Sequence, residues 1–141
     1  MRDDIECSAE NPMSEPRLDK TDRVVFHAKA ASYESADELL VAVAAEEVDG
    51  DGARFEFQRA AAFDDQDVRL GMNTYCISTE TGASHYGGVA EAEFEHTAVN
   101  IDLDVHAAAD LDVPQRIRIE LDMSSKQAAS FVSGLKTILQ R

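Results

Sequence analysis

A strict alternation of apolar and polar residues between positions 99 and 105 constrains the fold more than any other feature of the sequence. The apolar set is Val99, Ile101, Leu103 and Val105, and the polar set between them is Asn100, Asp102 and Asp104. Successive side chains of a β-strand point to opposite faces, so this pattern predicts a strand with one buried and one solvated face. A sheet with one face in water is typical of antiparallel pairing.

Shorter alternating stretches predict further strands over residues 24–29, 55–58, 75–77, 89–94 and 117–121. Residues 38–46 are apolar at nearly every position, which fits a strand buried on both faces or a short helix. Their length and their valines favour the strand.

Two turns and a short helical segment are predicted between these strands. Asp49-Gly50-Asp51-Gly52 is a turn sequence, so residues 38–59 are predicted to form a hairpin. Residues 107–111 predict a short helical turn, and the chain turns again over residues 79–84.

The C-terminal segment is predicted to be an amphipathic helix. Ser124 with Gln127 three residues later is the sequence of a capping box. Apolar residues then recur at helical spacing (Ala128, Phe131, Val132, Leu135, Ile138 and Leu139). With hairpin-length connections, the chain is predicted to be α+β, a mainly antiparallel sheet of about seven strands with this helix packed on it.

The sequence divides into a leader and one domain. Residues 1–22 are polar and lack apolar periodicity, which predicts a disordered leader. Met13-Ser14-Glu15 also resembles a start, in which case residues 1–12 would precede the native start. Residues 23–141 are expected to form a single α+β domain.

The charge excludes two classes of partner. The chain has 28 acidic and 13 basic residues, giving a net charge of −15, which repels both nucleic-acid phosphate and anionic lipid. No segment reaches the roughly 18 apolar residues of a membrane span, and the N-terminus lacks an apolar signal core. We therefore expect a cytoplasmic protein, with Cys7 and Cys76 as reduced thiols.

Motifs for catalysis, metals and cofactors all fail. None of the four histidines (His27, His85, His96 and His106) pairs at a metal-ligand spacing. The calcium-loop pattern that starts at Asp49 has Ala53 and Ala60 where oxygen ligands are required. The stretch around Ser84 resembles a nucleophile elbow but has Tyr86 in place of the second glycine. No catalytic residue, metal or cofactor is expected.

Carboxylates occur in three groups: Asp64, Asp65 and Asp67; Glu91 and Glu93; Asp102 and Asp104. A row with a period of two is usually the solvated face of a strand. If the strands at 99–105 and 117–121 pair, Arg116 and Arg118 would lie opposite Asp102 and Asp104 as cross-strand ion pairs.

Several runs of the sequence resemble one family. They are Phe57-Gln58-Arg59, Asp64-Asp65-Gln66-Asp67, Leu70-Gly71-Met72-Asn73-Thr74-Tyr75-Cys76-Ile77 and Tyr86-Gly87-Gly88-Val89. They resemble immunity protein 10, a group of bacterial polymorphic-toxin immunity proteins, over about residues 23–141. The resemblance implies a cytoplasmic protein, not an enzyme, that binds and neutralises a cognate secreted toxin domain.

Within these runs, glycines are expected to serve special backbone angles or close approaches, namely Gly71, Gly87 and Gly88. Polar and aromatic residues are candidates for binding the partner, with turn capping and packing as the alternative (Asp64, Asp65, Asp67, Asn73, Tyr75 and Tyr86). The acidity would suit a basic toxin, because opposite charge accelerates encounter.

Two other functions stay open at this point. One is a small hydrolase-type enzyme that uses a carboxylate pair with His85 or His96, which requires these groups to converge in one pocket. The other is a structural module that self-associates through a free sheet edge or an uncovered apolar stripe on residues 128–139.

Overall fold

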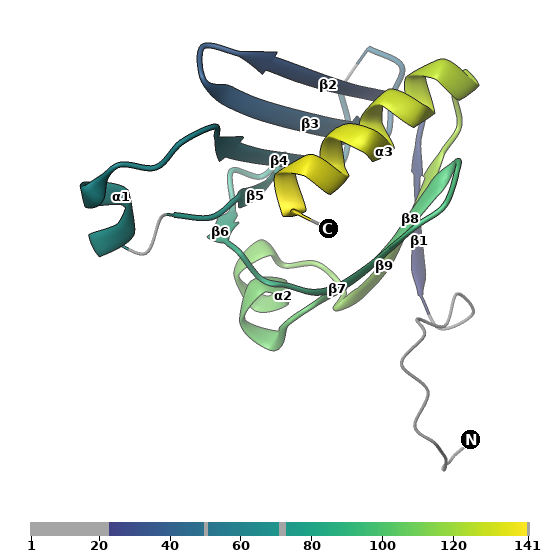
Figure 1. The fold of residues 1–141 in the computed structure, drawn as a ribbon. Coiled ribbons are helices and arrows are strands. Elements are labelled where there is room, and N and C mark those ends of the chain that lie inside the picture. Colours follow the sequence, from purple (N-terminus) through teal and green to yellow (C-terminus); the bar gives the residue numbers. More distant parts are fainter. Residues whose placement is uncertain (1–22, 50, 71–72, 141) are drawn as a thin grey trace.

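The computed structural model describes residues 23–49, 51–70 and 73–140. In these ranges the chain forms two sheets and three helices (Figure 1). The first sheet has the order β1 (Val24–Ala28), β9 (Arg116–Leu121), β8 (Ala98–Leu103) and β7 (Val89–Phe94). The second has the order β2 (Ala30–Ala36), β3 (Leu39–Ala45), β4 (Arg54–Ala60), β5 (Cys76–Thr79) and β6 (Ser84–Tyr86). The helices are α1 (Asp65–Arg69), α2 (Val105–Leu111) and α3 (Ser125–Leu139).

Antiparallel pairing dominates, so the predicted α+β class is confirmed. Within the described residues β1 and β9 form the one parallel pair. The predicted hairpin is β3 and β4, which settles residues 38–46 as a strand. The prediction of about seven strands missed β2 and β6, and the leader 1–22, with Cys7, lies outside the described residues.

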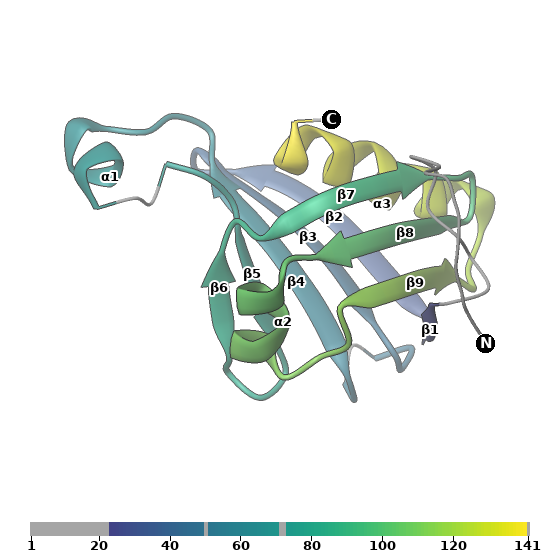
Figure 2. The same cartoon turned by 90° about the horizontal axis from the view of Figure 1, so that it is seen from below.

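The two sheets are joined at two corners into a partly closed barrel. Only Lys29 separates β1 from β2, and only Gly87 and Gly88 separate β6 from β7, so each corner strand bends from one sheet into the other (Figure 2). Gly87 and Gly88 have φ of 71° and 100°. A Cβ on Gly88 would lie 2.5 Å from the Cβ of Ala107. The prediction of special backbone angles here is confirmed, whereas Gly71 lies outside the described residues.

The core lies between the sheets and beneath α3. Small and large side chains alternate across the β3–β4 pair, where Ala42 faces Phe57 and Ala44 faces Phe55. The small alanine side chains allow α3 to pack against β3. Phe57 and Ile101 of the other sheet border the same small void in the core. The whole predicted apolar stripe of α3 is buried (Ala128, Phe131, Val132, Leu135, Ile138 and Leu139). Self-association through an uncovered stripe is therefore ruled out.

At the start of α3, one of the two hydrogen bonds of the predicted capping box is present. The Ser124 hydroxyl accepts a hydrogen bond from the Gln127 backbone N–H at 3.2 Å. The Gln127 side chain does not return to Ser124 but donates from Nε2 to the carbonyl oxygen of Ala31 at 3.1 Å. This bond fastens the first turn of α3 to β2.

The alternating strand at 99–105 ends earlier than predicted. Asp104 caps α2, because its Oδ1 accepts from the Ala107 N–H at 2.8 Å, and Val105 is the first residue of that helix. The expected pair of Arg116 with Asp102 is present, with 3.5 Å between Nε and Oδ1. The rest of that expectation is wrong, because Arg118 lies opposite Asn100 and Asp104 caps α2.

Candidate functional site

The segment that connects β4 to β5, which we call the arm, is described over residues 61–70 and 73–75 and carries the short helix α1. Both ribbon views show α1 standing apart from the two sheets (Figures 1 and 2). Backbone bonds from Val68 to Asp64 and from Leu70 to Gln66 form its turns. The side chains of Val68 and Leu70 are 55% and 61% exposed, although both are apolar. A segment that exposes aliphatic side chains on a highly charged protein is a candidate for binding another molecule.

A cleft of about 290 Å³ lies at the base of this arm. It is bordered by β3, β4, β5, β6 and the arm itself, through Leu39, Gln58, Arg59, Ala60, Phe63, Thr74, Cys76 and Tyr86. Leu39 and Tyr86 are 40% and 45% exposed. Of the eight large apolar side chains exposed in the described residues, four therefore gather at this end of the molecule (Leu39, Val68, Leu70 and Tyr86).

Arg59 anchors one wall of the cleft. Its guanidinium carbon lies 5.1 Å from the centre of the Phe63 ring, a cation–π arrangement. Its terminal nitrogens lie 2.7 Å from the Gln140 side-chain oxygen when that amide is turned to accept. Arg59 therefore ties the end of α3 to the first residues of the arm.

The structure brings most of the predicted partner-binding residues to this end. Asp64, Asp65 and Asn73 are exposed on the arm, and Tyr86 borders the cleft. Asp67 lies on α1, although its side chain is not among the described ones. We call the exposed residues of this end the arm surface (Asp64, Asp65, Val68, Leu70, Asn73, Leu39 and Tyr86).

Tyr75 is placed differently from the other candidates. Its side chain is buried, and its hydroxyl accepts a hydrogen bond from the Val89 N–H at 2.9 Å. This bond connects the last residue of the arm to the first residue of β7. The packing role of Tyr75 thus has direct geometric support, and its ring is not part of the arm surface.

A comparison of this chain with models of known protein families finds one family that matches. The family model for Immunity protein 10 matches residues 27–129, which is most of the chain. This chain belongs to the Immunity protein 10 family. The matched range runs from β1 to the first turn of α3 and includes the arm and its cleft. Searches of curated proteins and of solved structures gave no match.

Outside the arm, this Immunity protein 10 member carries a network of paired charges on the outer face of its first sheet. Arg118 donates to both oxygens of Glu95, at 3.0 and 3.2 Å. It also donates to Glu120 at 2.9 Å and to the Asn100 oxygen at 3.0 Å. The hydrogen bonds to Glu95 and then to Glu120 raise the pKa of Arg118 above its already high ordinary value. The guanidinium of Arg118 therefore has its partners within this face.

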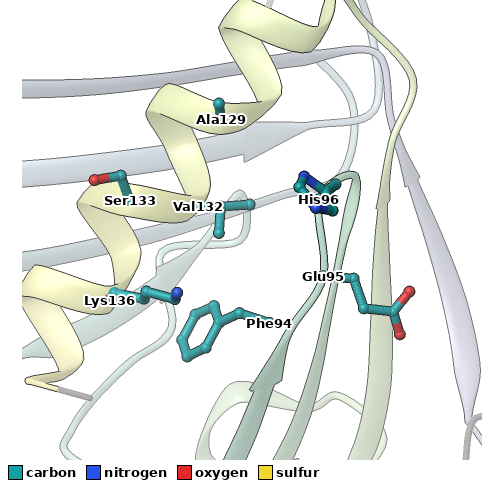
Figure 3. Close-up of a pocket in the computed structure, with 7 residues that line it drawn as sticks. All are labelled: Phe94, Glu95, His96, Ala129, Val132, Ser133 and Lys136. Carbon is teal, nitrogen blue, oxygen red and sulfur yellow. The ribbon is translucent and has the colours of Figure 1, made fainter.

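The histidines do not assemble an acid–base site in the described residues. His85 Nδ1 lies 2.7 Å from Asp110 of α2, a residue that sequence reasoning did not single out. His96 lies elsewhere, beside the groove between β7 and α3, where the Glu95 side chain turns away from Lys136 (Figure 3). The carboxylate that pairs with His85 belongs to none of the predicted carboxylate groups, and no group of three potential metal ligands occurs among the residues described.

No helix in the part of the chain that the structure describes is long and apolar enough to cross a membrane. Cys76 is a free, buried thiol at the wall of the arm cleft, as the sequence predicted for a reduced cysteine.

Proposed function

We propose that this protein neutralises a cognate secreted toxin domain by binding it stoichiometrically in the cytoplasm of the producing cell. Membership of the Immunity protein 10 family over residues 27–129 is the observation that carries this proposal. The net charge of −15 supports a basic partner, because opposite charges steer the encounter and raise association rates by roughly 10- to 1,000-fold. Inhibition follows from covering the active site of the toxin or a surface beside it, without catalysis.

We propose the arm surface as the part of the protein that contacts the toxin. It combines exposed aliphatic residues and Tyr86 with the carboxylates of Asp64 and Asp65, and Asp67 on α1 stays a further candidate for toxin binding. Interfaces typically pair an apolar, aromatic-rich centre with a polar rim, and standard ones bury on the order of 1,600 Å² in total. In this arrangement Val68, Leu70 and Tyr86 supply the centre, and the carboxylates pair with lysine or arginine of the toxin.

The test is a rescue experiment followed by a binding measurement. The C-terminal domain encoded by the adjacent large gene is expressed in a test host with and without this protein, and survivors are counted. We expect the domain to kill the host and this protein to restore growth and co-purify with the domain. Failure to bind and to rescue would overturn the pairing with that toxin.

A matched pair of variants tests the face. Leu70→Ala removes an exposed apolar side chain from the arm surface, and Val105→Ala removes one of similar exposure from α2. We expect Leu70→Ala to weaken toxin binding by about tenfold or more, since losing the burial of three side-chain carbons costs about 2 kcal/mol and each step of about 1.4 kcal/mol is a factor of ten in affinity. Val105→Ala should leave the affinity unchanged. Equal effects of the two changes would show that the arm is not the contact surface.

A further inference from the structure

A second pocket lies at the end of the barrel that α3 does not cover. It has a volume of about 300 Å³ and lies between β1, the start of β4, the β5–β6 turn and the connection from α2 to β9. These segments meet at one end of the molecule, away from α3 (Figure 2). We call this pocket the barrel mouth. Its apolar lining includes Val24, Phe26, Phe55, Leu111, Val113 and Ile117.

The barrel mouth is a blind pocket whose floor includes two packed aromatic rings. The rings of Phe26 and Phe55 meet edge to face there, with 5.1 Å between their centres. Below them the core is closed, because the void bordered by Phe55 and Ile117 measures only about 10 Å³. At the opening, Val24 is 55% exposed. An apolar group that entered would find a preformed surface and would cover an exposed valine.

Helix geometry explains why this end stays open. α2 stops at Leu111, and Asp112 takes the left-handed conformation with φ of 56°, so the chain turns away before it crosses the barrel end. At the opposite end the fifteen residues of α3 fill the corresponding space. Apolar residues of the core, such as Phe55 and Ile117, therefore border an open pocket at this end.

The rim of the barrel mouth is acidic. Glu80 and Asp112 border the pocket together with one cation, Arg54. Glu46 lies next to it, since its Oε1 accepts from the Ala53 N–H at 3.3 Å. The same β3–β4 connection carries three more acidic residues, which do not line the pocket (Glu47, Asp49 and Asp51). In a protein of net charge −15, this rim attracts cationic groups and repels anionic ones.

We propose that the barrel mouth is a second binding site, which takes one aliphatic or aromatic side chain of a peptide segment flanked by lysine or arginine. The volume of about 300 Å³ is at the small end of ligand sites, which suits one large side chain. The apolar side chain fills the pocket, and its basic neighbours pair with Glu80 and Asp112. This site is distinct from the arm surface, because Arg54 and Ala60, at opposite ends of β4, border the two pockets.

Two capped tripeptides provide the test, with phenylalanine placed between two lysines or between two glutamates. Each is titrated into the protein at low salt while the backbone amide chemical shifts are followed. We expect the lysine peptide to shift the amides around Val24, Thr81 and Val113, and the glutamate peptide to leave them unchanged. Equal binding of both peptides, or shifts that map outside the barrel mouth, would overturn the proposal.

A matched pair of double variants tests the role of the rim. Glu80→Gln with Asp112→Asn removes two charges while keeping the Glu80 acceptor for the Arg54 N–H and a residue that tolerates the left-handed conformation. Glu91→Gln with Asp122→Asn removes the same charge from exposed positions away from the pocket. We expect the first pair of substitutions to weaken binding of the lysine peptide by about threefold or more, and the second pair to weaken it less. Equal weakening would show that overall charge alone draws the peptide, contrary to the proposal. The amide spectra of the free variants show whether each is folded.

Discussion

The ring of Tyr33 on β2 lies directly against the Cα of Gly134 in α3. A Cβ built on Gly134 would overlap the Cγ and Cδ1 atoms of that ring and would approach the Tyr33 Cβ to 2.8 Å. Glycine inside a helix costs about 1 kcal/mol relative to alanine, so its presence in the middle of α3 needs a packing reason. The close approach of β2 supplies it, together with the small residues Ala31 and Ala42 on the strands below.

Gly134→Ala is therefore expected to destabilise the protein despite the better helix propensity of alanine. Overpacking costs about 1–3 kcal/mol, which outweighs the gain in propensity because the overlap reaches the base of the Tyr33 ring, where rotation gives little relief. Urea unfolding measures the change, with Ser133→Ala, an exposed position on the same helix, as the control. A Gly134→Ala variant more stable than the parent would show that the ring moves aside freely.

The charge network on the first sheet is expected to contribute to stability through Arg118. Arg118→Met removes the donor to Glu95 and leaves the oxygen of Asn100, a fully buried residue, without that partner. We expect a loss of about 2 kcal/mol in the free energy of unfolding, because buried polar groups without partners are costly.

The pH dependence of this loss follows from the direction of the pKa shift. The pKa of Arg118 is raised in the folded state, so its contribution is fully present below the unfolded value and declines only at strongly alkaline pH. The loss should therefore be constant between about pH 6 and 9 when measured by urea unfolding. Lys126→Gln, on the exposed side of α3, is the control, and an equal loss for both variants would refute the role of the network.

Substitutions of the two tyrosines near the arm are expected to have different effects, one on stability and the other on toxin binding. Tyr75→Phe removes the hydroxyl that accepts from Val89 and should lower the free energy of unfolding by about 1 kcal/mol, with toxin affinity unchanged. Tyr86→Ala removes a ring from the arm surface and should weaken toxin binding by tenfold or more, since aromatic residues are frequent hot spots. Urea unfolding and calorimetric titration give the two quantities. If Tyr75→Phe weakened binding as much as Tyr86→Ala, the division between them would be wrong.

Much of the fold was predictable because local patterns agreed with the final packing. The alternation along β8 and β9 and the apolar stripe of α3 each match a buried face, so element type followed from periodicity. β2 was missed because its buried side chains include small ones, such as Ala31 beneath α3. Its sequence therefore shows no strong alternation of apolar and polar residues. β6 has only three residues, too few for any pattern.

The candidate site was predictable only in part. The acidic run and Tyr86 stood out in the sequence, and the fold brings them to one end of the molecule. Leu39, Val68 and Leu70 could not be found in this way, because an exposed aliphatic residue and a buried one look alike without the fold. The tertiary position of the arm, away from both sheets, is what exposes them.

The carboxylates of the arm are expected to act on the rate of association with the toxin more than on the lifetime of the complex. Asp64→Asn with Asp65→Asn removes two exposed charges and conserves shape, so the steering field at the arm weakens while the apolar centre is kept. We expect the association rate constant to fall by about fivefold at low salt and to approach that of the parent protein at high salt, where charges are screened. Stopped-flow or surface-binding kinetics over a salt series measures this. The control is Glu91→Gln with Asp122→Asn, which removes the same charge elsewhere and should have a smaller effect. An unchanged association rate at low salt for the Asp64 and Asp65 variant would show that the arm does not steer the encounter, even if the toxin is still neutralised.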